Sequence, residues 1–296
     1  MTDEVWEYGA DQRHVDLLID GLSLSQAKGA GTPGEEDKKW EEGEEENREE
    51  LPDDQVRQYR GYAARLNYLA ADCPDIAYAV KEVCRGMAKP TRGHWKKLKR
   101  IGRYLIDAGR MVTKYRWQGE EDTVEVYTDS DWAGCRQTGK STSGSAVMVG
   151  EHFIKSWATT QASITLSSAE AELVAMTKAT AELLGLLYMV QDFGRRIKGV
   201  VHADSSAALA IADRKGSGKL RHINIRMLWI QEKQERGEVE LRKIHGAVNP
   251  ADLLTKHLPA GRLNDLTWRL AQYPKAGRAR LALEVQGSRH LSSSCS

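Results

Sequence analysis

The sequence contains few cysteines. Only four occur in 296 residues, at wide and irregular spacings, and no two of them form a CxxC pair. This scarcity argues against a disulfide framework and against a cysteine-rich zinc site. No cleavable apolar leader follows Met1, so we expect a reducing compartment, cytoplasmic or nuclear, and a protein that is not secreted.

The sequence also lacks an apolar run of the roughly 20 residues that a membrane-spanning helix needs. Its most apolar stretch, Leu183 to Val190, is much shorter. An apolar content of 41% is nevertheless enough for a hydrophobic core. We therefore expect a soluble protein without a membrane partner, built as one large domain or two ordinary ones.

The net charge of +1 is the sum of two unlike parts. Residues 1–50 hold 16 acidic and 5 basic side chains, a net charge of −11. The other 246 residues hold 38 Lys and Arg against 26 Asp and Glu, a net charge of +12 that is compatible with binding to nucleic acid. Residues 29–54 open with Gly and Pro and continue with a self-repelling run of acids, which predicts a flexible linker.

Residues 55–110 show apolar residues at helical spacings of three and four, interrupted at Pro74 and Pro90. This pattern predicts three helices. The third, roughly His94 to Leu105, carries five basic residues on its polar surface: Lys96, Lys97, Lys99, Arg100 and Arg103. Such a surface suits a phosphate backbone, and a solvated helix face is an equally good interpretation.

From Gly119 onward the apolar period becomes that of strands. Residues 123–128 alternate, and Ser145–Val149 with Phe153–Ala158 predict a hairpin about Gly150. The expected elements that follow are a long helix over 169–193, a strand at 200–201, helices from 205 and over 223–235, a strand over 239–244 and a short helix from 250. Strands that first adjoin and then alternate with helices indicate a mixed sheet with helices packed on it.

Three acidic residues fall at the ends of these elements. Asp129 closes the first strand, Asp204 closes a later one, and Asp252 opens the last short helix. Reactive groups gather at the carboxyl ends of adjacent strands in open sheets. Taken singly, each acid has a structural alternative, as a strand-end turn former, a helix N-cap or a first-turn dipole partner, respectively.

A fourth acid is expected from the segment SSAEAEL, which offers two candidates. Glu170 stands three residues after Ser167 in a capping-box pattern and therefore has a structural duty. Glu172 lies about 200° further round the helix and can point over the strand ends. We therefore choose Glu172 over Glu170.

Four carboxylates with few histidines or thiolates favour Mg²⁺ or Mn²⁺ over zinc. Two such ions about 4 Å apart can activate water and stabilise both the attacking and the leaving oxygen of a phosphoryl displacement. The acids together therefore predict phosphodiester hydrolysis.

The ordered motifs resemble those of a known family. Six segments are similar, in order, to the ribonuclease H region of copia-type retrotransposon polyproteins: YTDSDWAG, KSTSGSAVMVG, FIKSWATTQASITLSSAEAEL, HADSSAALAIA, LRHINIR and NPADLLTKHL. The segment from YRGYAARLNYL to KRIGRYL resembles the end of the reverse transcriptase upstream. Together these segments cover about residues 57–258, and Val5 to Gly34 weakly matches the edge of the polymerase palm.

The resemblance implies an α/β fold, a ribonuclease H-like mixed five-stranded sheet flanked by helices and preceded by a small helical segment. It implies a metal-dependent endonuclease that hydrolyses the RNA strand of an RNA–DNA hybrid with two Mg²⁺ (or Mn²⁺) ions. It assigns catalytic and metal-binding roles to Asp129, Glu172, Asp204 and Asp252, with Asp131 a poorer ligand candidate. His245 would be the analogue of a histidine that assists product release or proton transfer in cellular members.

Basic residues near this proposed site could position the phosphates of the hybrid without reading sequence. They are Lys140, Lys215, Lys219, Arg221 and His222. A solvated surface remains the alternative for each lysine, whereas Arg221 and His222 lie within a family motif.

The resemblance and the composition divide the chain into five parts. They are a remnant of the palm edge (1–28), the acidic linker (29–54), a helical thumb- or connection-like segment (55–118), the ribonuclease H domain (119–260) and a loosely held C-terminal tail (261–296). The catalytic aspartates of the polymerase are missing, so we expect no DNA synthesis by this chain alone and consider a separate polymerase chain as a partner in a retroelement particle.

Two functions from different classes remain open. The first is an active hybrid nuclease, supported by the intact acidic quartet. The second is a catalytically decayed, nucleic-acid-binding remnant of a retroelement, supported by the missing palm and the acidic linker. A DNA-cutting or strand-transferring relative is disfavoured because the motif order matches ribonuclease H throughout.

Overall fold

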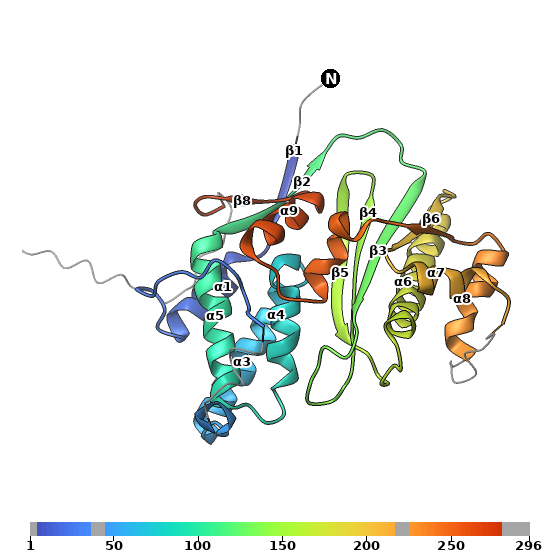
Figure 1. Cartoon of the computed structure of the whole chain (residues 1–296). Coiled ribbons are helices and arrows are strands. Elements are labelled where there is room, and N and C mark those ends of the chain that lie inside the picture. The colour runs from blue at the N-terminus through green and yellow to red at the C-terminus, as the bar shows by residue number, and fades with distance from the viewer. Residues whose placement is uncertain (1–4, 37–44, 217–224, 280–296) are drawn as a thin grey trace, which may run out of the picture.

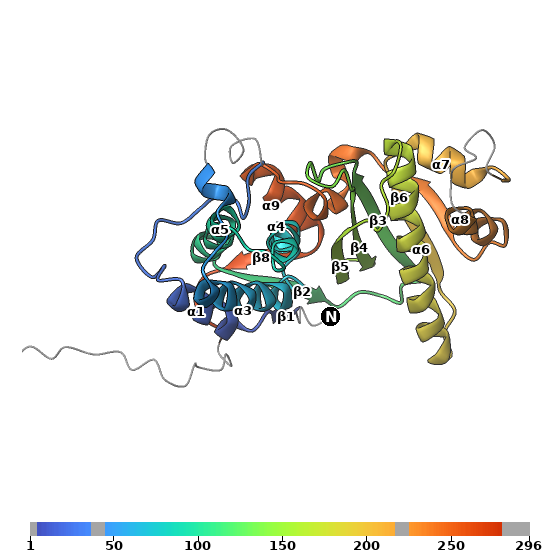
Figure 2. The same ribbon diagram turned by 90° about the horizontal axis from the view of Figure 1, so that it is seen from below.

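The computed structural model describes residues 5–36, 45–216 and 225–279, which form two β-sheets with helices packed around them (Figure 1). The larger sheet has five strands and the smaller has three. Figure 2 shows the helices α3, α4 and α5 on one side of the five-stranded sheet and α6, α7 and α8 on the other.

The five-stranded sheet has the order β5-β4-β3-β6-β7. Its strands are β3 (Thr123–Asp131), β4 (Thr142–Val149), β5 (His152–Thr160), β6 (Lys198–Ala203) and β7 (Glu240–Lys243). The predicted hairpin is confirmed, because β4 and β5 pair antiparallel about Gly150, whose φ is 57°. β3 pairs parallel with β6, and β6 with β7, so these three strands end at one edge of the sheet.

Helix α6 (Ser168–Asp192) covers one face of this sheet. Val126 of β3 packs with Leu183 of α6, and both are fully buried. α7 (Ser206–Asp213) and α8 (Ile225–Glu235) extend this layer beside β6 and β7. By length and composition α6 could also cross a membrane, but the core helix of a soluble protein passes the same test, and α6 has ten buried residues.

The helical segment packs on the other face of the sheet, through one shared core. It consists of α3 (Asp53–Leu69), α4 (Pro74–Arg85) and α5 (Arg92–Ala108). α4 contacts β5 and the 3₁₀ helix η3 (Pro250–Leu254), so Ile76 and Val80 belong to the same core as Phe153 and Leu253. Burial of these side chains attaches the helical segment to the five-stranded sheet.

The smaller sheet joins three distant parts of the chain. β1 (Val5–Gly9) and β8 (Gln272–Lys275) each pair antiparallel with β2 (Arg110–Arg116), and α1 (Gln12–Gly21) follows β1. Residues 110–116 are thus a strand at the end of a segment that was expected to be helical. The partner strands of β2 lie far away in the sequence, so the local periodicity of residues 110–116 does not indicate the pairing.

The prediction of a loose tail over 261–296 is wrong for the part that the structure describes. Helix α9 (Ala260–Arg269) buries Leu263 and Leu266 in the main core. The Gln272 side chain then donates to the Asp72 carbonyl at 2.9 Å, and β8 completes the small sheet. Apolar burial and strand pairing therefore hold residues 260–275 in place.

The prediction of a flexible linker over 29–54 is also wrong for its described residues. Ala30 and Leu51 are buried. The Leu51 N–H donates to the Pro90 carbonyl at 2.9 Å, and η1 (Glu45–Arg48) lies beside α5. Residues 37–44 lie outside the described residues. Like-charge repulsion within the segment is offset by cations that α5 supplies.

The expected fold class is confirmed. The sheet begins with three antiparallel strands and continues with parallel strands that alternate with helices. This is the ribonuclease H-like mixed five-stranded sheet flanked by helices, with a helical part before it.

Candidate active site

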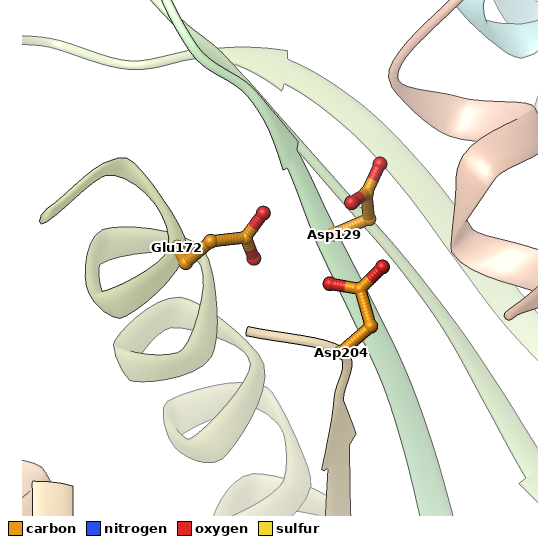
Figure 3. Close-up of side chains that lie close together, drawn as sticks. All are labelled: Asp129, Glu172 and Asp204. Carbon is orange, nitrogen blue, oxygen red and sulfur yellow. The ribbon is translucent and has the colours of Figure 1, made fainter. Parts of the chain in front are cut away.

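Three carboxylates meet near the ends of β3 and β6, although β3 continues two residues past Asp129, to Asp131. Asp129 belongs to β3, and Asp204 directly follows β6, whose last residue Ala203 pairs with Thr128. Glu172 projects toward them from the first turns of α6, as Figure 3 shows. Each of the three offers an oxygen atom, and these oxygens all lie within 4.8 Å of one another. Parallel pairing of the strands and the start of α6 thus create one acidic cluster.

The structure places Glu172, not Glu170, in this cluster. Ser167 caps α6, and its hydroxyl accepts the Glu170 N–H at 3.2 Å. Glu170 has the structural duty that was expected, although its Oε2 accepts the Leu166 N–H at 2.7 Å, one residue before the cap. Its carboxylate is thereby tied to the loop before the helix. That Glu172 binds metal stays a prediction.

Burial raises the pKa of Glu172 to about 8, and the negative charges of Asp129 and Asp204 add to this effect. The Ser130 N–H donates to Glu172 Oε1 at 3.1 Å and acts in the opposite direction. Glu172 Oε2 is buried and has no hydrogen-bond partner in the part of the chain that the structure describes. The cluster therefore favours either a proton or a cation at Glu172.

Burial also raises the pKa of Asp129, to about 6. The Lys256 ammonium and a hydrogen bond from the Thr255 hydroxyl oppose this rise, while Asp252 and Asp204 reinforce it. Asp129 is only 3% exposed, so its charge is poorly screened by water. Neighbouring cations thus decide whether Asp129 is ionised near neutral pH.

Asp252, the fourth predicted ligand, stands beside the cluster rather than in it. Its Oδ1 lies 2.8 Å from Lys256 Nζ, and its Oδ2 lies 3.1 Å from an Arg262 guanidinium nitrogen. Lys256 Nζ also lies 3.3 Å from Asp129 Oδ2. The lysine therefore bridges two of the four predicted carboxylates. Burial alone would lower the pKa of Lys256, but Asp129 and Asp252 raise it well above its usual value.

Sequence reasoning did not identify Lys256, Thr255 or Arg262 as site residues. Lys256 had a usable signal, because it follows Asp252 by four residues within NPADLLTKHL. Thr255 occupies the same motif. Arg262 had none, since it belongs to α9, in the part of the chain that was expected to be a loose tail.

The structural alternative for Asp204 was that it caps the following helix. Ser205 takes that role instead, because its hydroxyl accepts the Ala208 N–H at 3.2 Å. Asp204 is held near the cluster by other contacts: its backbone carbonyl accepts from Lys243, and Gly246 approaches its carboxylate closely. Its side chain is therefore available to a ligand.

The remaining predicted site residues lie in different settings. His245 precedes Gly246, and its Nδ1 accepts the Ala247 N–H at 3.1 Å as a cap of η2 (Gly246–Val248). Lys140 lies in the loop before β4, where its carbonyl accepts from Cys135. The roles assigned to His245 and Lys140 stay predictions.

Other predicted residues do not join the cluster. Asp131 lies at the end of β3, outside the group of three, and burial raises its pKa. Lys215 pairs with Glu235 at 2.5 Å. Lys219, Arg221 and His222 lie outside the described residues.

No protein-family model matches the chain. The "Retrovirus-related Pol polyprotein from transposon RE2" of Arabidopsis thaliana is 32% identical over 216 residues, which are 70% of this chain and 14% of that protein. The "Retrovirus-related Pol polyprotein from transposon TNT 1-94" of Nicotiana tabacum is 33% identical over 193 residues, which are 64% of this chain and 14% of that protein. The chain thus spans about a seventh of the length of these relatives.

Ribonuclease H1 of the archaeon Halobacterium salinarum is a similar solved structure. It is 19% identical, the match covers 45% of this chain and 94% of that one, and the TM-score is 0.32.

Proposed function

Because the chain belongs to the copia-type retrovirus-related Pol polyproteins and contains their ribonuclease H-like nuclease domain, we propose that it hydrolyses the RNA strand of RNA–DNA hybrids with divalent metal ions. The observation that carries this proposal is the convergence of Asp129, Glu172 and Asp204 within 4.8 Å at the end of β3 and β6. A buried carboxylate group of this kind needs a positive partner to remain ionised.

The donor set suits Mg²⁺ or Mn²⁺. All three side chains offer carboxylate oxygens, and Glu172 Oε2 is buried without a hydrogen-bond partner among the described residues. Asp129, Glu172 and Asp204 would hold the ion, and Asp252 would complete the ligands for a second. When bound, two such ions supply an activated water and stabilise the attacking and leaving oxygens of the phosphodiester.

The chain's own residues prepare these carboxylates. The Ser130 N–H orients Glu172, and the Thr255 hydroxyl orients Asp129. The Lys256 ammonium neutralises charge between Asp129 and Asp252. Fixed donors and a nearby cation keep the carboxylates in place before substrate arrives, which is the preorganisation that phosphoryl transfer requires.

The similarity to Pol polyproteins supports the proposal of a nucleic-acid substrate. We also propose a separate polymerase chain as a partner. The proposed location is a cytoplasmic or nuclear retroelement particle. Lys140 lies just before β4, which supports its proposed role in binding nucleic acid. His245 precedes Gly246, which lies close to the Asp204 carboxylate, and this supports its proposed role in product release.

The test is cleavage of a labelled RNA–DNA hybrid in Mg²⁺, compared with RNA and DNA duplexes of the same sequence. We expect the parent to cut only the RNA strand of the hybrid, and Asp129→Asn and Asp204→Asn to lose at least about a hundredfold in rate. Asp131→Asn is the matched control, because Asp131 shares the motif and lies outside the cluster.

Two outcomes would contradict the proposal. If the parent binds the hybrid and does not cut it, the decayed nucleic-acid-binding remnant is the correct function. If Asp129→Asn cuts as fast as the parent, the cluster is not the active site.

A further inference from the structure

A basic row runs along α5, outside the acidic cluster. Arg92, Lys96 and Arg100 follow one another at intervals of four residues, so they share a face of the helix and lie roughly 6 Å apart along its axis. This row overlaps the basic surface that the sequence suggested for a phosphate backbone. In the structure, however, the row is occupied by carboxylates of the chain itself.

The occupant is the acidic arm, which we define as the described residues 28–36 and 45–51. Glu35 lies 2.8 Å from Arg100, Glu49 lies 2.8 Å from Arg92, and Glu46 lies 3.2 Å from Arg92 and 4.0 Å from Lys96. Each of the three cations in the row thus faces at least one carboxylate of the arm.

Hydrogen bonds to main-chain atoms of the arm fix it at both of its described ends, at the first end from the Arg103 guanidinium. Arg103 donates to the Lys28 carbonyl at 2.7 Å. At the other end the Arg92 N–H donates to the Glu49 carbonyl at 2.9 Å, and Glu50 and Thr91 form an isolated β-bridge. The arm is therefore ordered along α5 by these polar contacts, together with the burial of Ala30 and Leu51 in the main core.

The row and the active site are linked through the arm itself. Gly34 lies so close to the His257 ring that a side chain at position 34 would collide with it. His257 packs edge-on against Tyr78 of α4 at 4.8 Å and directly follows Lys256, the lysine between Asp129 and Asp252. α4 lies between α5 and the five-stranded sheet (Figure 2). The arm thus passes from the basic row to the neighbour of a site residue.

The contacts of Arg92 with the arm are of a kind that a polyanion can replace, whereas Arg100 and Glu35 are less exposed, at 20% and 30%. Arg92 is 51% exposed and its partners Glu46 and Glu49 are 53% and 57% exposed, and exposed ion pairs contribute only about 0–1 kcal/mol each. A nucleic-acid duplex presents one negative charge per roughly 1.7 Å of its axis and gains counterion release when cations bind it. Phosphates therefore compete favourably with three carboxylates.

From these contacts we propose that the basic row of α5 docks the phosphodiester backbone of nucleic acid, and that the acidic arm covers this row until nucleic acid displaces it. The inference rests on the proposed function, because it takes the competing polyanion to be the nucleic-acid substrate. It assigns the acidic arm to control of substrate binding, and the arm takes no part in the hydrolytic step.

The experiment measures binding of a 20-base-pair RNA–DNA hybrid and of a DNA duplex of equal length by the full chain, in EDTA and at low salt. We expect the triple variant Glu35→Gln/Glu46→Gln/Glu49→Gln to bind both duplexes about tenfold more tightly than the parent. Its affinity should also fall more steeply with salt, by up to about 2.7 in the log–log slope, because in the parent the three carboxylates released from the row take up counterions again.

Two further variants make this result specific. Glu120→Gln/Glu121→Gln/Glu151→Gln changes the net charge equally at the opposite end of β3 from Asp129, and its affinity should match that of the parent. Adding Arg92→Gln/Lys96→Gln/Arg100→Gln to the arm variant should abolish the tenfold gain. An equal gain in the control triple variant, or no gain in the arm variant, would overturn the inference.

Hydrogen exchange on the unaltered protein gives a second measurement that does not depend on a variant folding. The amides of Leu51 and Arg92, which donate to Pro90 and Glu49, should exchange faster once a DNA duplex is bound. Slower or unchanged exchange would mean that the arm stays in place. Loss of hybrid cleavage would count against the proposed function alone, because duplex affinity and exchange report on the row without any hydrolysis.

Discussion

The Lys256 ammonium lies 2.8 Å from Oδ1 of Asp252, four residues earlier in the chain. The same nitrogen is 3.3 Å from Asp129, so one side chain connects η3 with β3. Asp129 belongs to the buried cluster with Glu172, and Asp252 stands beside it, so unbalanced negative charge is costly there. Lys256 is therefore the cation that these two acids share, and Arg262 adds a second positive charge at Asp252.

Replacing Lys256 by Met should destabilise the metal-free protein by about 1 kcal/mol, a figure that allows for the 43% exposure of the lysine. The reason is that Asp129 and Asp252 lose their shared cation while remaining largely buried. Urea unfolding in EDTA at pH 7 measures the difference. Lys155→Met is the matched control, since Lys155 is 42% exposed and pairs with a single partly exposed carboxylate, Glu182. Equal losses in both variants would show that the bridging position has no special weight.

The raised pKa of Glu172 predicts a fall in stability with rising pH. Its pKa is about 8 in the folded protein and near 4.5 when unfolded, so between these values the folded state holds the proton that the unfolded state has lost. The contribution of Glu172 to the free energy of unfolding is fully present below about pH 4.5 and is lost as pH rises through about 8. Glu172→Gln should remove this slope and be more stable than the parent at pH 8 in EDTA, by on the order of a few kcal/mol.

Urea unfolding of the parent and of Glu172→Gln at pH 5, 6.5 and 8 measures this slope directly. The control is Glu182→Gln, which removes a carboxylate from the same helix at a partly exposed position. Parallel curves for the parent and Glu172→Gln across this range would contradict the prediction.

The acidic cluster was accessible to sequence reasoning because its geometry is local. Asp129 follows an alternating apolar run, and Asp204 follows a second apolar strand. The cap at Ser167 fixes where α6 begins, and this determines the directions in which Glu170 and Glu172 point. Strand ends and helix phase depend on residues within a few positions, which is the range over which periodicity carries information. The position of Asp252 was less accessible, because it depends on how Lys256 and Arg262 divide its two oxygens.

Contacts between distant segments account for what the sequence did not predict. β8 pairs with β2 from about 160 residues away, and nothing in QYPK indicates that partner. The acidic arm was expected to be flexible because its own charges repel, and that argument omits Arg92 and Arg100, which lie 40 to 65 residues further along the chain. Composition describes a segment alone, whereas its order depends on what faces it.

Divalent cations should stabilise the protein through the acidic cluster. A ligand that binds only the folded state adds about 1.4 kcal/mol at ten times its Kd, so Mg²⁺ or Mn²⁺ should raise the Tm at pH 8 relative to EDTA. Glu172→Gln should lose most of this rise, since it removes one of three converging carboxylates. Thermal unfolding with and without metal measures the effect, and Asp131→Asn should keep it. An equal rise in Glu172→Gln would place the metal elsewhere.

Truncating Leu266 tests whether α9 belongs to the core. Leu266 is fully buried, and Leu263 of the same helix is 3% exposed. Leu266→Ala should therefore cost about 2–5 kcal/mol of unfolding free energy, the usual range for a large-to-small change in a packed core. Asp265→Ala, at the exposed neighbouring position, should stay within about 0.5 kcal/mol of the parent. Because Arg262 on α9 holds Asp252, Leu266→Ala should also slow hybrid cleavage at temperatures where the protein is still folded. If the two variants unfolded at the same urea concentration, packing of α9 on the core would not contribute to the free energy of unfolding.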